Sequence, residues 1–469
     1  MGSLRVLAID LGASNGRGIV GDFDGERLAI SPVHSFPNRM AQIRGAWYWD
    51  IIRLYDETLT AMKRAEGFPG GPPSSVAIDG WAQDFGLLDR EGNLLGNVHT
   101  YRDPYSAGMK EGFAELMGDE AFYARTGLET GGILSLFQLM GLREKEKAIY
   151  ENAHTFLFVA DLVKYFLTGE KNCCVTLAGL SGLFDIHEGR WSEEILGLAG
   201  LKRIFPPVSG TRERIGVIDV PGRASRIQLL SVATHDTASA LSFIPDQGEG
   251  AFLISSGTWS GAGHALAAPE TKPEALRQGL LSELGFDESI YLVKNLTGLW
   301  IEQELLRQWD LGDVSAAALR LEAGNSHYGH AFDTQSEEFA APGQMEEKIL
   351  AALSGHGHPL PEGRAAIYRC VMRSLACKYR DTIEAFEANK GGKFDRIHIV
   401  GGGSQNALLN QLTADICGRP VSAGPAEATA IGNIAGQLLA LGEIKDVGQA
   451  REVVSRSFPG KTFLPGKRL

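Results

Sequence analysis

Two segments far apart in the chain share one pattern of residues. Residues 5–20 and residues 251–265 each combine an apolar run typical of a β-strand, a tight turn of small residues and a second strand-like run. Small residues allow backbone N–H groups to approach an anion closely. Two such hairpins can hold one polyphosphate between them, so the repeated pattern predicts a two-lobed nucleotide-binding protein with a cleft.

Length and charge narrow the class of protein. A chain of 469 residues is too long for one core and predicts two or three domains. The net charge of −12 disfavours binding to nucleic acids or to anionic membranes, which attract basic proteins. No apolar run approaches the roughly 20 residues of a membrane span, and the chain starts on a strand-like run rather than a signal sequence. We therefore expect a cytoplasmic globular protein.

The five cysteines are expected to be reduced structural thiols. They are Cys173, Cys174, Cys370, Cys377 and Cys417, an odd number that cannot pair completely. If Cys370 and Cys377 share one helix, their Cα atoms lie about 10.5 Å apart along its axis. A disulfide needs less than roughly 7 Å.

Short apolar runs alternate with helix-like periodic segments, which predicts α/β layers. The expected strands are Val6–Asp10, Gly18–Phe23, Val76–Asp79, Phe85–Leu88, Leu229–Ala233, Phe252–Ser255, Tyr291–Lys294 and Arg396–Val400. The expected helices are Ile51–Glu66, Glu302–Trp309, Met345–Leu353, Arg364–Ala388, Ala407–Cys417 and Thr429–Leu441. The seam between the repeated hairpins predicts one lobe over residues 1–240 and a second over residues 241–469.

One glycine pattern is misleading. Residues 16–21 satisfy the G-x-G-x-x-G spacing of a dinucleotide-binding loop, but that loop must open a helix. Here Asp22, Asp24 and Gly25 follow at once, which indicates a strand that ends in a turn. We therefore reject a nicotinamide-binding fold.

The end of the first strand is a candidate phosphate and metal site. Asp10 stands where the strand runs into the turn, so its carboxylate can hold Mg²⁺, through water, beside phosphates bound at residues 13–17. Arg17 offers a positive charge there. The Asn15-Gly16 pair is equally typical of a simple hairpin turn.

Asp236 is the candidate catalytic residue. It lies where a strand passes into a helix, in the first helical turn, where the helix dipole favours a carboxylate. Such a group can orient a hydroxyl and accept its proton during phosphoryl transfer. An aspartate at this position is also a common helix N-cap, so both roles remain open.

Two loops in the second half are candidates for nucleotide contacts. Thr258, in the second hairpin turn, could donate to a phosphoryl group. Gly401, Gly402 and Gly403 stand between a strand and a helix, where an open backbone surface could support a purine or simply form a packing turn.

Taken in order, these segments resemble the FGGY carbohydrate kinases, over nearly the whole chain. The matching residues are 10–17, 101–103, 234–239, 255–260, 294–300, 332–333, 339–342, 345 and 401–406. Within the family, they are most similar to the kinases of L-rhamnulose. The resemblance implies an α/β fold of two actin-like ATPase (ribonuclease H-like) lobes around a central cleft, with the sugar on the first lobe and ATP mainly on the second.

The resemblance also implies a role for each matching position. Asp236 would be the catalytic base. The ATP-binding residues would be Ala13, Ser14, Asn15, Gly16, Arg17, Thr258, Gln303, Gly402 and Asn406. The sugar-binding residues would be Ala82, Gln83, His235, Asp236, Thr237 and Asn295.

The sugar-side loop departs from the family pattern. Ala82 and Gln83 stand where the L-rhamnulose kinases carry Gly and Val. An amide that faces a sugar changes which hydroxyl pattern is accepted, because unmatched polar groups discriminate strongly. The identity of the sugar is therefore the open part of the prediction.

The resemblance implies ATP-dependent phosphorylation of a ketose, with the 1-hydroxyl of L-rhamnulose as the first choice. L-Fuculose and L-xylulose are alternative substrates within the class. A non-catalytic nucleotide switch like actin or a chaperone ATPase is the alternative outside it. The expected partners are a sugar and ATP with Mg²⁺, neither nucleic acid nor membrane, and the chain is expected to be a monomer or a homodimer.

Overall fold

The computed structural model describes residues 4–218, 226–245 and 247–466, and the chain forms two compact units. Unit 1 consists of residues 1–245, 265–292 and 429–457. Unit 2 consists of residues 246–264, 293–428 and 458–469. After leaving unit 1 at residue 245, the chain therefore returns to that unit twice, at residues 265 and 429.

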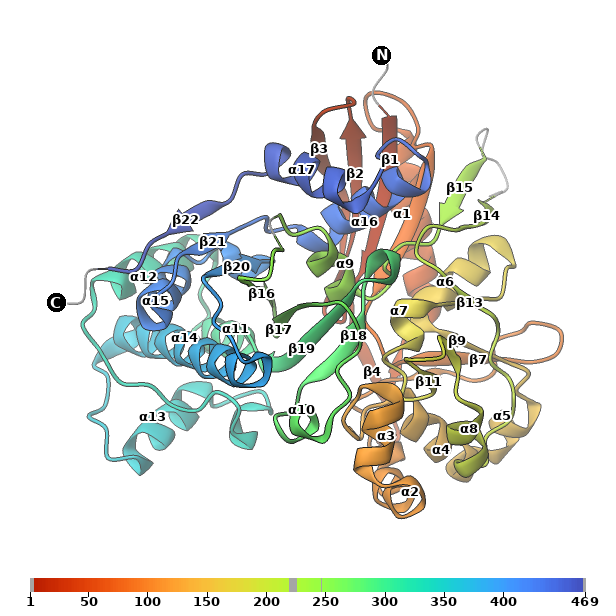
Figure 1. The fold of residues 1–469 in the computed structure, drawn as a ribbon, viewed down its shortest axis with the longest axis horizontal. Coiled ribbons are helices and arrows are strands. Elements are labelled where there is room, and N and C mark those ends of the chain that lie inside the picture. Colours follow the sequence, from red (N-terminus) through yellow and green to blue (C-terminus); the bar gives the residue numbers. More distant parts are fainter. Residues whose placement is uncertain (1–3, 219–225, 246, 467–469) are drawn as a thin grey trace. The chain divides into compact units, whose positions relative to one another are not determined.

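Unit 1 contains the larger number of elements, shown from red to green in Figure 1 with α16 and α17 in blue. Its strands are β1 (Leu4–Leu11), β2 (Asn15–Phe23), β3 (Leu28–Pro37), β4 (Met40–Ile43), β5 (Ala46–Trp49), β6 (Ser75–Gly80), β7 (Phe85–Leu88), β8 (Val98–His99), β9 (Thr155–Phe158), β10 (Cys173–Cys174), β11 (Phe184–Asp185), β12 (Arg190–Trp191), β13 (Val208–Ser209), β14 (Arg214–Ile218), β15 (Ile227–Leu230) and β18 (Leu281–Leu284). Its helices are α1 (Ile51–Glu66), α2 (Met109–Met117), α3 (Asp119–Thr126), α4 (Ser135–Lys145), α5 (Lys147–Asn152), α6 (Val159–Thr168), α7 (Val175–Ala178), α8 (Glu193–Leu198), α9 (Asp236–Ser242), α10 (Pro273–Arg277), α16 (Ala428–Ala440) and α17 (Val447–Ser457), with 3₁₀ turns at Pro104–Ser106 and Phe286–Glu288.

Unit 2 is built on fewer strands and longer helices. Its strands are β16 (Ala251–Ser256), β17 (Trp259–Leu266), β19 (Ile290–Thr297), β20 (Arg396–Val400), β21 (Val421–Ala423) and β22 (Lys461–Phe463), of which β17 and β19 begin or end in unit 1. Its helices are α11 (Trp300–Gln308), α12 (Asp313–Asn325), α13 (Met345–Gly355), α14 (Gly363–Lys390) and α15 (Ala407–Cys417), with 3₁₀ turns at Glu337–Phe339 and Gly402–Gln405.

The central sheet of unit 1 lies between two layers of helices. Its strand order is β14-β15-β6-β1-β2-β3. In β2, a Cβ at Gly18 would meet Ala61 of α1, whereas a Cβ at Gly21 would meet Ile434 of α16. Positions an odd number apart in a strand point to opposite faces. Helices α1 and α16 therefore cover opposite faces of the sheet, and the strands between them are apolar because they are buried on both sides.

The two units repeat the same strand plan. In unit 1, β1 and β2 form an antiparallel hairpin and β6 pairs parallel to β1. In the second sheet, whose strand order is β18-β19-β17-β16-β20-β21-β22, β16 and β17 form the hairpin and β20 pairs parallel to β16. Helix α14 packs on the second sheet, where Tyr379 contacts the hydroxyls of Ser256 and Ser260 at 3.1 Å each. The architectural repeat predicted from the hairpins is confirmed.

Local sequence signals predicted both ends of some helices correctly. Helices α1 and α15 have the predicted bounds. Asp50 caps α1 by accepting from the N–H of Arg53, and Gly418 ends α15 in the left-handed conformation with φ 65°. Strand β15 ends at Leu230, three residues before its predicted end. The strand predicted to start at Gly18 begins at Asn15.

The glycine pattern at residues 16–21 lies wholly within β2, so the rejection of a dinucleotide-binding loop is confirmed. All five cysteines are free thiols. Cys370 and Cys377 share α14, as the spacing argument assumed.

Candidate active site

Asp236 is the first residue of α9, and His235 occupies the N-cap position. The alternative interpretation of Asp236 as the N-cap is therefore wrong. Its Oδ1 accepts hydrogen bonds from the backbone N–H of Thr237 at 2.5 Å and from the Thr237 hydroxyl at 3.1 Å. The side chain keeps an exposed fraction of 33%. These donors and the helix N-terminus stabilise negative charge on a carboxylate that a ligand can still reach.

Three aspartates meet at one edge of the central sheet of unit 1. Asp10 of β1 is the register partner of Asp79 in the parallel strand β6. The next residue, Gly80, forms a parallel bridge with His235, which immediately precedes Asp236. Because parallel strands end at the same edge, their carboxyl ends bring Asp10, Asp79 and Asp236 together.

Asp79 is fully buried, and its environment disfavours its charge. Burial, and next the charge of Asp10, raise the pKa of Asp79 well above its usual range, and Asp236 adds to the rise. A hydrogen bond of 2.5 Å from Asn433 Nδ2 to Asp79 Oδ2 opposes the rise. The effect of both neighbours on Asp79 indicates a concentration of negative charge that would favour a cation.

The residues at this edge fit a magnesium ion held largely by water and phosphate. Among the residues that the structure describes, no three His, Cys, Asp or Glu side chains converge as a metal ion would require. Mg²⁺ usually keeps several waters and takes only one or two protein carboxylates beside substrate phosphates. A single carboxylate such as Asp10 is enough for that mode of binding.

A buried lysine supplies the opposite charge. Lys164 of α6 donates to Asp161 Oδ1 at 3.1 Å and to the hydroxyl of Thr234 at 2.7 Å. Its charge lowers the pKa of Asp79. Lys164 therefore both offsets the acidic group and holds the segment that leads into α9.

His235 lies between two carboxylates. Its Nε2 is 3.5 Å from Asp236 Oδ1, and its Nδ1 is 3.6 Å from Glu283 Oε2 of β18. Its backbone N–H donates to the hydroxyl of Thr176 at 3.1 Å. Three of the predicted sugar-binding residues are consecutive in the chain: His235, Asp236 and Thr237.

The amide of Gln83 is bonded to protein groups. Its Nε2 donates to Leu180 O at 3.0 Å, and its Oε1 accepts from the N–H of Ser135 at 3.2 Å. The residue adopts φ 82°, in the left-handed region that non-glycine residues rarely occupy. These bonds join three segments of unit 1 through the amide oxygen and one amide hydrogen, and the contact of Gln83 with a sugar stays a prediction. Ala82 beside it is partly buried.

The first hairpin turn differs from the expected one. The turn residues are Gly12, Ala13 and Ser14, closed by a bond from Gly12 N to Asn15 O at 3.1 Å. Asn15, Gly16 and Arg17 already belong to β2, so the interpretation of Asn15-Gly16 as the turn is wrong. A Cβ at Gly16 would lie 2.0 Å from the ring of Phe36, which explains the glycine by packing. Ser14 and Asn15 are exposed.

In unit 2, Thr258 and Gln303 come together although they are far apart in sequence. The hydroxyl of Thr258 donates to Gln303 Oε1 at 3.2 Å, and both side chains reach solvent. The residue that precedes α11 holds the turn in place, because Leu299 N donates to Gly257 O at 2.7 Å. Asn295, a predicted sugar-binding residue, is exposed on β19.

The three glycines at 401–403 have different environments. A Cβ at Gly401 or at Gly403 would meet Ser256 of β16 within 3.0 Å, whereas Gly402 faces open space. The packing-turn interpretation therefore explains two of the three glycines. Asn406 is buried and caps α15, accepting from Leu409 N at 3.1 Å. Of the three glycines, Gly402 is the exposed one, on which a ligand could rest.

Family comparison identifies the fold and the class of activity. The N-terminal domain of the FGGY family of carbohydrate kinases matches residues 5–241, and the C-terminal domain of that family matches residues 252–441. This chain belongs to the FGGY family of carbohydrate kinases. It is therefore an α/β protein with the actin-like ATPase fold and an enzyme that phosphorylates a carbohydrate with ATP.

Known sugar kinases resemble the chain over almost its full length. A rhamnulokinase of Bacteroides thetaiotaomicron is 36% identical over 98% of this chain and 95% of its own length. A rhamnulokinase of Pectobacterium atrosepticum is 32% identical over 98% of this chain and 93% of its own. The crystal structure of a ligand-bound xylulose kinase from Lactobacillus acidophilus has a TM-score of 0.80 at 15% identity, covering 98% of this chain and 94% of its own. At that identity, the structural likeness shows the fold alone.

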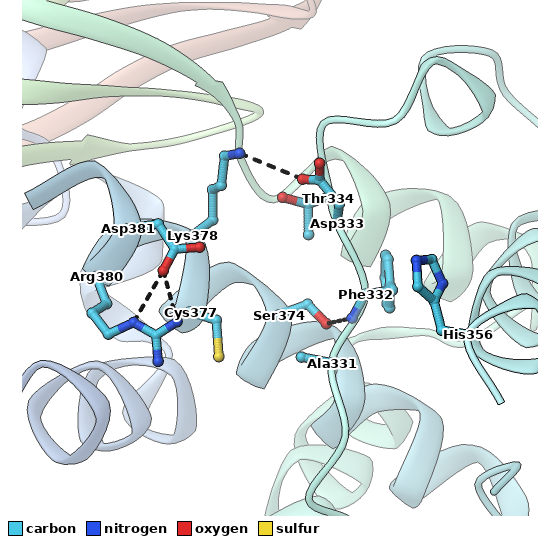
Figure 2. A pocket seen from close by; sticks show the side chains of 10 residues that line it. All are labelled: Ala331, Phe332, Asp333, Thr334, His356, Ser374, Cys377, Lys378, Arg380 and Asp381. Carbon is cyan, nitrogen blue, oxygen red and sulfur yellow. Dashed lines mark hydrogen bonds and ion pairs between the residues drawn. The ribbon is translucent and has the colours of Figure 1, made fainter. Parts of the chain in front are cut away.

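Unit 2 of this FGGY kinase also has a surface pocket, separate from its predicted ATP-binding residues (Figure 2). It encloses about 370 Å³ between residues 331–334, His356 and residues 374–381 of α14. Its charges are paired, Lys378 with Asp333 at 3.5 Å and Arg380 with Asp381 at 2.7 Å. None of the predicted ATP-binding residues of unit 2 lines it.

None of the described helices is both long and apolar enough to span a membrane.

Sequence reasoning missed three side chains of the site: Asp79, Lys164 and Glu283. Asp79 ends an apolar run just as Asp10 does, and that parallel was a usable signal. Lys164 and Glu283 had no such signal, because each stands in an ordinary helix or strand pattern and reaches the site only through tertiary packing.

Proposed function

We propose that this FGGY kinase transfers the γ-phosphoryl group of ATP to the 1-hydroxyl of L-rhamnulose. The observation that carries the activity is the accessible carboxylate of Asp236 at the start of α9, beside Asp10 and Asp79. The choice of sugar rests on the rhamnulokinase relatives, at up to 36% identity over 98% of this chain.

In the proposed reaction, Asp236 orients the sugar hydroxyl and accepts its proton as the oxygen attacks the γ-phosphorus. Late proton transfer asks for little basicity, since positioning and charge stabilisation dominate phosphoryl transfer. Thr237 holds Asp236 Oδ1 in place by its N–H and its hydroxyl. His235, Thr237 and Asn295 would bind the sugar, with Ala82 beside it and Gln83 fixing the loop.

The nucleotide would be held by both repeated hairpins. Ala13, Ser14, Asn15, Gly16, Arg17 and Thr258 would contact the phosphates, with Gln303 beside Thr258. Gly402 would lie against the nucleoside. Asn406, as the cap of α15, would hold the loop of residues 401–405 in place. Bound Mg²⁺, with Asp10 as its protein residue through water, would neutralise phosphate charge.

The test combines a sugar panel with one substitution. ADP formation is measured with L-rhamnulose, L-fuculose, L-xylulose and no sugar. We expect L-rhamnulose to give the highest kcat/KM. Asp236→Asn should lower kcat by at least about 10³-fold while ATP affinity stays within about twofold, because the base is lost and the nucleotide contacts remain.

Other outcomes decide between the alternatives. A preference for L-fuculose or L-xylulose would keep the kinase and replace the sugar. ATP binding without any sugar-dependent ADP would favour a nucleotide switch. Near-normal turnover by the Asn variant would remove Asp236 from the mechanism.

A further inference from the structure

Two buried polar atoms face each other behind the proposed sugar site without a hydrogen-bond partner. They are His235 Nδ1 and Glu283 Oε2, which lie 3.6 Å apart. A hydrogen bond between these atoms needs about 2.7–3.2 Å. An approach of roughly half an ångström would satisfy both atoms, and catalytic hydrogen bonds often tighten in this way when substrate binds.

Glu283 has few other ways to satisfy its charge. Its exposed fraction is 3%, and it projects from the short strand β18. Burial raises the pKa of Glu283, while the adjacent His235 opposes the rise. A buried carboxylate costs free energy unless it is paired, and the imidazole is the partner within reach.

The other side of the same ring faces the proposed base. His235 Nε2 lies 3.5 Å from Asp236 Oδ1, and the backbone of His235 is fixed by Thr176. The order Glu283, His235, Asp236 thus runs from the buried interior of unit 1 to the exposed carboxylate. A carboxylate behind an imidazole sets which nitrogen carries hydrogen and how the ring is turned.

We propose that Glu283 is a positioning residue for sugar binding, an inference that rests on the proposed function. Glu283 accepts the Nδ1–H of His235 and thereby directs Nε2 at the sugar hydroxyls beside Asp236. Glu283 does not touch the sugar itself, so its effect reaches the substrate through the orientation of His235.

Steady-state kinetics of the full chain test the consequence for the sugar. Glu283→Gln keeps the shape and removes the charge, and Glu283→Asp keeps the charge on a shorter side chain. We expect Glu283→Gln to raise the KM for L-rhamnulose about tenfold, the factor of one charged hydrogen bond, with the KM for ATP unchanged. Glu283→Asp should recover part of the loss. The matched control is Glu288→Gln, which removes an exposed carboxylate five residues along the chain.

Nitrogen NMR of the ¹⁵N-histidine-labelled protein tests the hydrogen position without needing turnover or a stable variant. The His235 signals are assigned by their loss in His235→Gln. A protonated Nδ1 in the unsubstituted protein is the expected result. An unprotonated Nδ1, or sugar KM and kcat values unchanged in both Glu283 variants, would overturn the proposal. If the unsubstituted protein shows no sugar-dependent ADP formation, the proposed function fails, and the state of Nδ1 still decides the contact with Glu283.

Discussion

Asp84 shows what one buried carboxyl group does to the chain around it. Its oxygens accept from the indole N–H groups of Trp49 at 2.6 Å and of Trp81 at 2.9 Å, and from Gln138 Nε2 at 3.3 Å. Burial nevertheless raises its pKa from 3.8 to about 7. The residue directly follows the Ala82–Gln83 pair, so its hydrogen bonds also fix the loop proposed to lie beside the sugar.

The raised pKa gives stability a definite pH dependence. A carboxyl whose pKa rises on folding keeps its proton in the folded state between about pH 4 and pH 7, so its contribution is complete below pH 4 and is lost as the pH rises through 7. The loss is on the order of 4 kcal/mol at most. Asp84→Asn cannot titrate, so it should gain stability relative to the unsubstituted protein between pH 5 and pH 8, measured by urea midpoints from tryptophan fluorescence.

Asp89→Asn is the control for that measurement. Asp89 is a partly exposed carboxylate whose pKa is lowered by hydrogen bonds from Asn93, so it is ionised throughout this range. Its effect should be the same at pH 5 and pH 8. A pH-independent difference for Asp84→Asn as well would contradict the assignment of the titration to Asp84.

At the scale of elements, helix α16 fixes the position of α9. Its Thr429 O accepts from the hydroxyl of Ser239 in α9 at 3.1 Å. Gly432 allows the two helices to approach, since a Cβ there would lie 2.0 Å from Ser239 O. The sequence predicted α16 as a helix from periodicity, with bounds shifted by one residue at each end. The sequence offered no reason for Gly432, which only the contact with α9 explains.

Two glycine substitutions in helices should act with opposite sign. Gly432→Ala should lower the free energy of unfolding by about 1–3 kcal/mol, because the methyl group meets a backbone oxygen that cannot move aside. Gly112→Ala in α2, where a Cβ meets nothing within 4 Å, should raise it by about 0.4–1 kcal/mol.

Urea unfolding followed by circular dichroism measures both variants. Gly432→Ala should also lower kcat with the proposed sugar, since α9 begins at Asp236. Equal stability changes in the two variants would show that the contact with Ser239 is not limiting.

At the scale of the whole molecule, unit 1 is completed by chain that follows unit 2. Gln437 of α16 accepts from the hydroxyl of Ser75 at 2.6 Å and donates to Leu7 O at 2.9 Å. Asn433 donates to Ala77 O at 3.2 Å. These partners are buried polar groups in β1 and β6. Without α16 they would have no hydrogen-bond partner, and an unsatisfied buried polar group costs free energy of folding.

A fragment of residues 1–245 should therefore fail to fold alone. It lacks β18, α16 and α17, which belong to unit 1 by packing. We expect no cooperative unfolding transition for the fragment, and recovery of one when residues 246–469 are supplied as a second chain. A cooperative transition of residues 1–245 alone, measured by tryptophan fluorescence in urea, would contradict this.

The sequence by itself determined the α/β class, the repeated hairpins, most element types and the family, because periodicity, caps and turn residues are local signals. It also placed Asp10, Asp236 and Thr258 at the ends of their strands and turns. Only the tertiary structure decided which groups surround them. Glu283 and Lys164 reach Asp236 and Asp79 across long stretches of chain, and the bonds of Gln83 hold distant backbone segments together. The physical reason is that burial and contacts between distant segments set the charge state and the orientation of these side chains. Neither can be read from the neighbouring residues in the sequence.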